Sequence, residues 1–149
     1  MVLQRVGRAS VTVEGAVVGE IGRGFLLLVG IERGDSVDDV AFAVAKIAGV
    51  RVFADDAGKM NLSIGDVSGE ILVVSQFTLL GDVRRGRRPS FTDAADPEVA
   101  APLVERMVES FTELGIPTQS GVFGASMSVD SVNEGPVTLL LSVRNARLD

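Results

Sequence analysis

The stretch ILVVSQFTLL, residues Ile71–Leu80, predicts the central element of the fold. A short apolar run bounded by turn residues is typical of a strand buried on both faces. The second half of this run is polar, however, because it contains Ser75, Gln76 and Thr78. A buried hydroxyl or amide without a partner costs about 1–3 kcal/mol. The polar end therefore belongs either to a satisfied hydrogen-bond network or to the floor of a binding site.

The composition limits the chemistry that the chain can perform. Its 149 residues are the size of one ordinary domain. No apolar run approaches the roughly 18 residues that a membrane span needs, and no signal peptide is present, so we expect a cytoplasmic protein. The chain contains neither cysteine nor histidine. This excludes a disulfide framework and any catalytic arrangement built on those residues, and a zinc site would need carboxylates alone. We expect no metal and no cofactor.

The charge of the chain argues against general binding to nucleic acid. Its net charge is −6, which would repel a polyanion, so we expect no DNA partner. One loop, Asp82–Pro89 (DVRRGRRP), is a local exception, with four arginines around Gly86: Arg84, Arg85, Arg87 and Arg88. Arginine suits bidentate contacts with phosphate. Two interpretations remain open, a solvated loop and a clamp for phosphate or RNA.

Hydrophobic patterns elsewhere predict a mixed α/β domain with several short strands. Besides the central run, strands are expected at Val2–Val6, Ser10–Glu14, Ala16–Ile21, Phe25–Ile31, Val50–Phe53, Gly121–Gly124, Ser126–Val132 and Val137–Ser142. Asn133–Pro136 is expected to be a turn. Its Gly135-Pro136 bond is expected to be trans on these grounds alone, because only about 5–6% of X-Pro bonds in folded proteins are cis.

Two helices are expected on the outside of these strands. The first follows an N-cap at Asp35-Ser36 and ends at Gly49. The second lies within Asp96–Leu114, with a kink or a late start because of Pro102. The last residues, 143–149, are expected to form a frayed tail after a domain of residues 1–142.

Four short motifs follow one another along the chain: Gln4-Arg5-Val6, Ser75-Gln76-Phe77-Thr78, Gly86-Arg87-Arg88-Pro89-Ser90-Phe91 and Asn133-Glu134-Gly135-Pro136-Val137-Thr138. In this combination the chain resembles the bacterial-type D-aminoacyl-tRNA deacylase family, also called D-tyrosyl-tRNA deacylases. The resemblance extends over about Met1–Ser142. The chain departs from the family at Leu80-Gly81, where an aromatic-Ala pair is expected, and in its longer C-terminal tail.

The resemblance implies a fold, an activity and a set of site residues. It implies a homodimer of mixed β-barrel-like subunits with two outer helices. It implies hydrolysis of the ester that joins a D-amino acid to the 3′-terminal adenosine of tRNA. It further implies that the Gly135-Pro136 bond is cis, that this loop enters the partner's site, and that Arg5 holds it. The pocket would be lined by Ser75, Gln76, Phe77, Thr78, Phe123 and Met127.

A mechanism without histidine or cysteine is chemically reasonable for an activated ester. The attacking water would be assisted by the 2′-hydroxyl of the terminal ribose, and the backbone N–H groups of Phe77 and Thr78 would stabilise the oxyanion. The carbonyl groups of Gly135 and Pro136 would receive the α-ammonium and leave no room for an L side chain. Glycyl-tRNA, which has no side chain to exclude, would be a second substrate.

Two alternatives remain. One is an esterase in which Thr78 or Ser75 is the nucleophile, although no base is expected beside it. The other is a non-catalytic module that binds RNA or nucleotides through the loop Arg84–Arg88.

Overall fold

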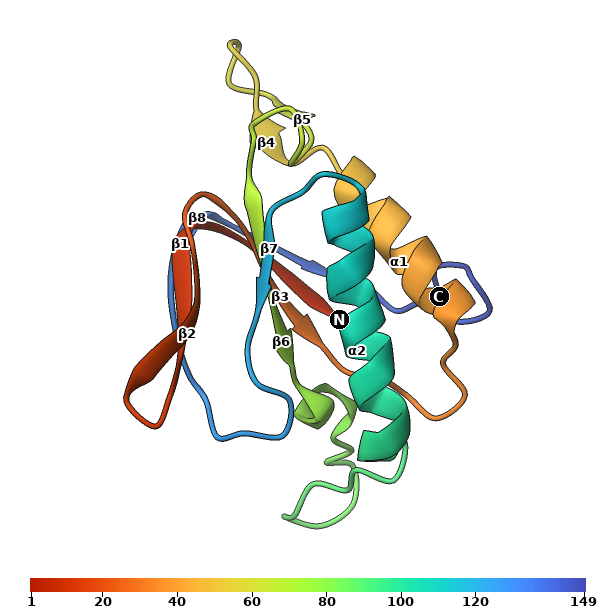
Figure 1. Cartoon of the computed structure of the whole chain (residues 1–149). Coiled ribbons are helices and arrows are strands. Elements are labelled where there is room, and N and C mark those ends of the chain that lie inside the picture. Colours follow the sequence, from red (N-terminus) through yellow and green to blue (C-terminus); the bar gives the residue numbers. More distant parts are fainter.

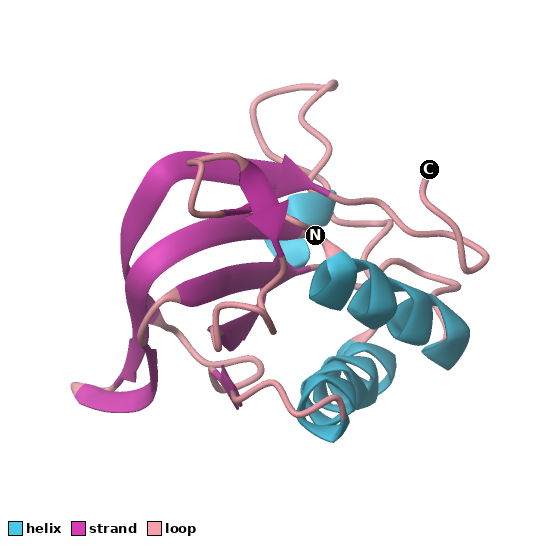
Figure 2. Ribbon diagram, turned by 90° about the horizontal axis from the view of Figure 1, so that it is seen from above, coloured by secondary structure: helices cyan, strands magenta, loops and turns pink.

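A strongly curved, six-stranded sheet with two helices against one side forms the molecule (Figures 1 and 2). The computed structural model covers residues 1–149. The strands of the sheet are β1 (Val2–Val13), β2 (Ala16–Ile21), β3 (Gly24–Val29), β6 (Glu70–Ser75), β7 (Thr118–Ser120) and β8 (Ser128–Leu140). The helices are α1 (Val37–Gly49) and α2 (Pro97–Glu113), and β4 (Phe53–Ala54) pairs with β5 (Met60–Leu62) in a separate small ribbon. The expected mixed α/β, barrel-like single domain is confirmed.

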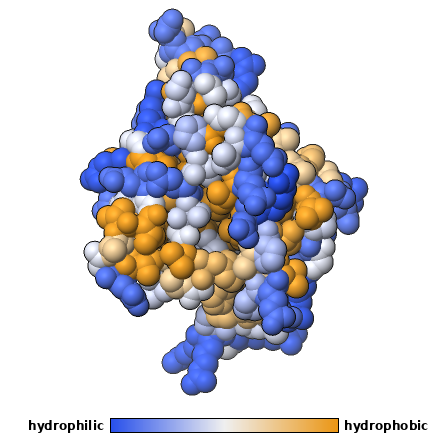
Figure 3. Space-filling model, in the orientation of Figure 1, coloured by the Kyte–Doolittle hydropathy of each residue, from blue (hydrophilic) through white to orange (hydrophobic).

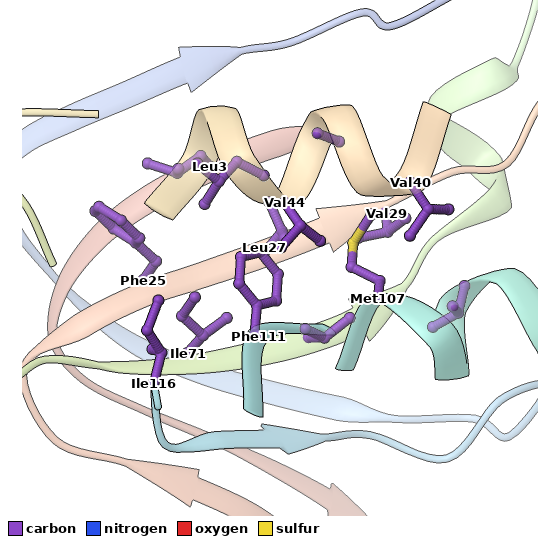
Figure 4. Packing of buried hydrophobic residues seen from close by; sticks show 14 of the residues in the cluster. Leu3, Phe25, Leu27, Val29, Val40, Val44, Ile71, Met107, Phe111 and Ile116 are labelled. Atoms are coloured by element: carbon purple, nitrogen blue, oxygen red, sulfur yellow. The ribbon is translucent and has the colours of Figure 1, made fainter. Parts of the chain in front are cut away.

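The sheet is mixed, in the order β2-β1-β3-β6-β7, with β8 paired to β1. The contacts of β6 with β3 and β7 are parallel, and the others are antiparallel. Side chains alternate between the two faces of β3 and β6, so Phe25, Leu27 and Val73 join the large core under the helices (Figure 4). Leu26 and Leu72 join a smaller core on the opposite face. The predicted burial of the central strand on both faces is confirmed.

The central strand is shorter than the sequence predicts. It ends at Ser75, and Phe77–Leu80 form a single 3₁₀ turn, η1. Pairing explains the end, because Val29, the last residue of β3, is the partner of Ser75. Beyond that point the chain folds on itself, with Leu79 N–H donating to the Gln76 carbonyl. The expectation of a strand up to Leu80 was wrong.

The first and last strands are longer than predicted, because they pair with each other over most of their length (Figure 1). β1 continues through Gly7, and β8 continues through Asn133–Pro136, where the sequence predicts a turn. Conversely, Gly121–Gly124 is a loop and not a strand, since Gly124 has φ +76° and Ala125 N–H donates to the Val122 carbonyl. The strand before this loop, β7, was not predicted.

The first helix begins where its cap predicts, and the second begins earlier than expected. The hydroxyl of Ser36, the N-cap of α1, accepts from Asp39 N–H, and the carboxylate of Asp39 accepts from Ser36 N–H. α2 starts at Pro97, where the Asp96 carbonyl accepts from the N–H groups of Val99 and Ala100, and it continues through Pro102. The expected late start was therefore wrong. Neither helix is long and apolar enough to cross a membrane.

The C-terminal tail is folded onto α1. Ala146 N–H donates to the carboxylate of Asp39 at 2.8 Å, and Asp39 is only 8% exposed. Arg144 donates to both carboxylate oxygens of Glu32 at 2.7 Å, and Val143 forms a bridge with Leu148. The expectation of a frayed tail was wrong, because its anchors lie more than 100 residues earlier in the chain and leave no local sequence signal.

Candidate functional site

A cavity of about 730 Å³ opens where β3 and β6 end. Its polar floor consists of Ser75, the last residue paired to β3, and Gln76, whose N–H donates to the Val29 carbonyl at 2.7 Å. The other walls come from Phe77, from the loop between β7 and β8 with Phe123 and Met127, and from Phe91. The segment before α2 and the start of α2 complete them (Ala94, Ala95, Asp96, Pro97, Ala100 and Val104). The cavity therefore combines a small polar end with mostly apolar walls, as is usual for small-molecule sites.

Two aromatic rings meet at the mouth of this cavity. Phe77 is 57% exposed, and its ring packs edge-to-face against Phe91, with centroids 5.0 Å apart. Phe91 also lies against Gly81, where an added Cβ would be 3.0 Å from the ring. Phe91 thus supports η1 from the side of the arginine-rich loop. It stands in one of the four motifs, but sequence reasoning did not identify it as a wall of the cavity.

The turn after β6 presents backbone donors. The N–H groups of Phe77 and Thr78 begin this turn and donate to no acceptor in the surrounding turns and loops, whereas those of Gln76, Leu79 and Gly81 do. The first N–H groups of a helical turn have no partner within it, so they are available to an outside acceptor. The side chain of Thr78 does not line the cavity.

The lining of the cavity contains one pair of ionisable side chains. Arg33 and Asp96 are the ionisable side chains of its lining, and they pair with each other at 3.2 Å. Sequence reasoning missed both, because they lie 63 residues apart and meet only where the segment after β3 pairs with the segment before α2, with Arg33 N–H donating to the Asp93 carbonyl at 2.9 Å. A reaction at this site would have to draw its proton transfers from the substrate or from water.

The Gly135-Pro136 segment lies outside this cavity, in a wide bulge between β1 and β8. Gln4 pairs with Thr138 and Val6 with Asn133, so the four residues 134–137 lie opposite Arg5 alone. The Gly135-Pro136 peptide bond is cis, as the family resemblance implies and against the expectation from the residues alone. In one chain, the structure brings Ser75, Gln76, Phe77, Phe123 and Met127 together, but it does not bring Arg5, Gly135 or Pro136 to them.

Arg5 fills the space beneath the bulge. It is only 8% exposed, and it donates from Nε to the Glu134 carbonyl at 3.0 Å and from Nη1 to the Val52 carbonyl. Gly135 has φ +119°, and a Cβ added to it would lie 2.8 Å from Arg5 Nη2. Gln4 completes the support, since the Thr138 hydroxyl donates to its Oε1 at 2.6 Å. The bulge is therefore fixed to β1 by side chains instead of by backbone pairing.

The arginine-rich loop is a closed, exposed hairpin beside η1. Asp82 and Ser90 exchange two backbone hydrogen bonds of 2.8 Å at its base. Arg84 donates from Nε and Nη2 to the carboxylate of Asp82, which lowers the pKa of Asp82 to about 2. The other three arginines, Arg85, Arg87 and Arg88, form no ion pair. They are free to meet an anion.

Known proteins resemble this chain over almost its whole length. The model of the D-Tyr-tRNA(Tyr) deacylase family matches residues 2–142. A D-aminoacyl-tRNA deacylase of Roseiflexus castenholzii is 56% identical over 94% of this chain and 89% of its own. One of Geobacter sulfurreducens is 53% identical over 97% and 95%.

Solved structures share the fold. A c-Myc DNA unwinding element binding protein superposes with a TM-score of 0.86 at 42% identity, covering 93% of this chain and 94% of its own. A probable eukaryotic D-amino acid tRNA deacylase superposes with a TM-score of 0.79 over 93% of this chain and 95% of its own. At 21% identity, the second likeness concerns the fold alone.

Proposed function

Since this chain belongs to the D-aminoacyl-tRNA deacylase family and is a hydrolase of ester bonds, we propose that its 730 Å³ cavity holds the 3′-terminal adenosine of D-aminoacyl-tRNA together with the esterified amino acid. The single observation that carries this proposal is the composition of the cavity. Its apolar and aromatic walls suit an unstacked base, and its polar floor of Ser75 and Gln76 suits the ester. The same proposal puts the protein in the cytoplasm, with the substrates of translation.

The substrate supplies the activating group in this mechanism. A water molecule, hydrogen-bonded to the 2′-hydroxyl of the terminal ribose, attacks the ester carbonyl carbon. The bond from that carbon to the 3′-oxygen then breaks, the amino acid leaves, and the proton of the water passes to the 3′-oxygen. The lining of the cavity supports this route, because its one carboxylate, that of Asp96, is paired with Arg33 and its other side chains are neutral. Positioning alone can lower such a barrier by several kcal/mol.

Backbone donors stabilise the charge that develops during the attack. The N–H groups of Phe77 and Thr78, the first two of η1, donate to the carbonyl oxygen as it becomes an oxyanion. In this mechanism Thr78 acts through its backbone N–H group and not through its hydroxyl. An acyl-enzyme on Thr78 or Ser75 is less favourable, since neither hydroxyl has a base within hydrogen-bond reach.

A second copy of the chain supplies the chiral filter. The carbonyl groups of the partner subunit's Gly135 and the partner subunit's Pro136 receive the α-ammonium, so an L side chain would run into backbone. Exposed apolar side chains support a dimer: Val129, Val132 and Leu140 on β8 are 42%, 46% and 80% exposed. Others gather over β2 (Figure 3). Surfaces of this kind are commonly covered by a partner.

The arginine-rich loop holds the acceptor end of the tRNA. Arg85, Arg87 and Arg88 are unpaired, and Arg84 is oriented by Asp82. The loop stands next to the mouth of the cavity, because Phe91 connects its base to Phe77. Contacts with the backbone of the single-stranded end would position the terminal adenosine without reading sequence.

The test is hydrolysis of matched D-tyrosyl-, L-tyrosyl- and glycyl-tRNA by the purified protein without added metal. We expect rapid loss of the D and glycyl esters and little loss of the L ester. A D-tyrosyl-tRNA with a 2′-deoxy terminal adenosine should resist hydrolysis. Loss of all three esters would discard the chiral filter, and hydrolysis of the 2′-deoxy substrate would discard the role of the ribose. Loss of none, from folded protein, would leave a binding module as the better account.

A further inference from the structure

We propose that Arg23 is a second positioning residue for the Gly135-Pro136 loop, acting through the side chain of Glu134, and that this ion pair contributes to the selectivity against L-aminoacyl esters. This inference rests on the proposed function, because it concerns the loop that filters the substrate. It adds a residue from the turn between β2 and β3, which none of the four sequence motifs contains.

The two side chains meet as a fork. Arg23 donates from Nε to Glu134 Oε2 and from Nη2 to Glu134 Oε1, both at 3.3 Å. Two parallel contacts fix the direction of the carboxylate as well as its distance. The side chains of Arg23 and Glu134 are 45% and 39% exposed, so both are partly shielded from solvent. Glu134 is the residue immediately before Gly135, at the start of the bulge.

Arg23 is itself held in place by the core. Its guanidinium carbon lies 5.1 Å from the centre of the Phe53 ring, in cation–π geometry. Phe53 is fully buried and stacks on Phe25 of β3, with centroids 5.1 Å apart. The backbone around Arg23 is equally fixed, since its carbonyl accepts from Glu70 N–H at 3.1 Å. A fixed platform means that the fork loses little side-chain entropy when it forms.

Arg5 and Arg23 donate hydrogen bonds to different atoms of Glu134. Arg5 holds the Glu134 carbonyl from beneath the sheet, and Arg23 holds the Glu134 carboxylate. One contact fixes the position of the backbone, and the other restricts its rotation. The loop has no ladder hydrogen bonds to β1 between Asn133 and Thr138, so these side chains replace them. Without Arg23 the loop would sample conformations in which Gly135 no longer excludes an L side chain.

The experiment compares single and double variants in hydrolysis of D-, L- and glycyl-tRNA. Arg23→Ala and Glu134→Ala should each raise the rate for the L ester by about three- to tenfold, the scale of one half-exposed ion pair with its aromatic platform. The rate for the D ester should stay within about twofold. The double variant should match the single ones, because both remove the same contact. Arg23→Lys should give an intermediate ratio, since lysine cannot form the fork.

The matched control is Arg106→Ala on α2. The Arg106 side chain is as exposed as that of Arg23 (43% against 45%), and it pairs with Glu113 through two contacts of 3.0 Å and with Glu109 at 3.2 Å. This variant should leave the ratio of L to D hydrolysis unchanged. Melting temperatures separate selectivity from stability, and a change in ratio at an unchanged melting temperature would not follow from a merely structural role. If Arg23→Ala does not fold, Glu134→Gln, which replaces one carboxylate oxygen by an amide, provides the same comparison.

A further variant distinguishes this inference from the proposed function. Gly135→Ala acts on the filter directly. If it alters the L-to-D ratio while the Arg23 and Glu134 variants do not, the inference is overturned and the proposed function stands. If no variant of the loop or of its supports alters the ratio, both are overturned.

Discussion

Replacing Gly135 with alanine is the most direct test of the loop that Arg5 supports. The added Cβ would lie 2.8 Å from Arg5 Nη2, closer than side-chain carbon and nitrogen approach in proteins. Arg5 cannot move aside freely, because it is buried and donates to two carbonyl groups, those of Glu134 and Val52. A non-glycine residue at φ +119° adds strain of its own.

The size of the effect follows from these two contributions. Backbone strain at such an angle costs about 1–3 kcal/mol. Loss of one hydrogen bond from a charged donor costs about 1.5–3 kcal/mol. Together these contributions amount to about 2.5–6 kcal/mol, and a value near the lower end, about 3 kcal/mol, corresponds to a fall of about 6–12 °C in melting temperature for a domain of this size. The same free energy limits the gain in hydrolysis of the L ester to about a hundredfold.

The assay has two readouts and one control. Thermal denaturation at equal protein concentration measures stability, and hydrolysis of D- and L-tyrosyl-tRNA measures selectivity. Gly49→Ala is the control, because Gly49 ends α1 with an ordinary φ and has open space around its Cα. We expect Gly49→Ala to match the wild type in both readouts. If Gly135→Ala did so as well, the reasoning about Arg5 and the loop would be refuted.

Three further predictions concern other parts of the molecule. Thr78→Ala should keep at least about a third of the activity, because only its backbone is used; a folded, tRNA-bound but inactive variant in a single-turnover assay would instead support a hydroxyl nucleophile. Replacing the three unpaired arginines of the loop, Arg85, Arg87 and Arg88, with glutamine should raise KM and lower the slope of log affinity against log salt by about 2. The slope is measured by tRNA binding from low to high salt, and an unchanged slope would contradict the prediction. The hydrogen bond from Ala146 N–H, followed by that from the Ser36 hydroxyl, lowers the pKa of Asp39. The stability from Asp39 should therefore be full above its ordinary pKa of 3.8 and be lost as the pH falls through the lower, folded-state value; urea unfolding of wild type and Asp39→Asn should differ at pH 7 and converge in acid, and a constant difference would argue against it.

Local sequence patterns correctly predicted the elements whose position and length depend on nearby residues alone. The run Ile71–Val74 is buried because of its own hydrophobicity, and Ser36 caps α1 through contacts within four residues. The end of β6 was not predictable in this way, because it depends on where β3 stops. The full length of β1 and β8 depends on their mutual pairing, which links residues such as Val2 and Leu140.

The same distinction between local patterns and long-range packing applies to the candidate site. The motif Ser75-Gln76-Phe77-Thr78 was recognisable from the sequence, and most of it lies at the cavity. The walls from α2 and the pairing of Arg33 with Asp96 were not, since they arise from packing between distant segments. Arg23 and Glu134 are separated by 111 residues in the sequence, so no local pattern around either residue predicts their ion pair.

The pairing of the first strand with the last has a consequence for biosynthesis. β1 leaves the ribosome first, but β8, its longest partner, is translated last. Until then, one edge of β1 lacks its neighbour, and unpaired strand edges favour aggregation. The bulge that carries Gly135-Pro136 belongs to that same late segment. A chain that terminates early would therefore lack the strand that closes its sheet together with the loop proposed as the filter. Because such an open sheet would not fold stably, a truncated product could not act as an unselective hydrolase.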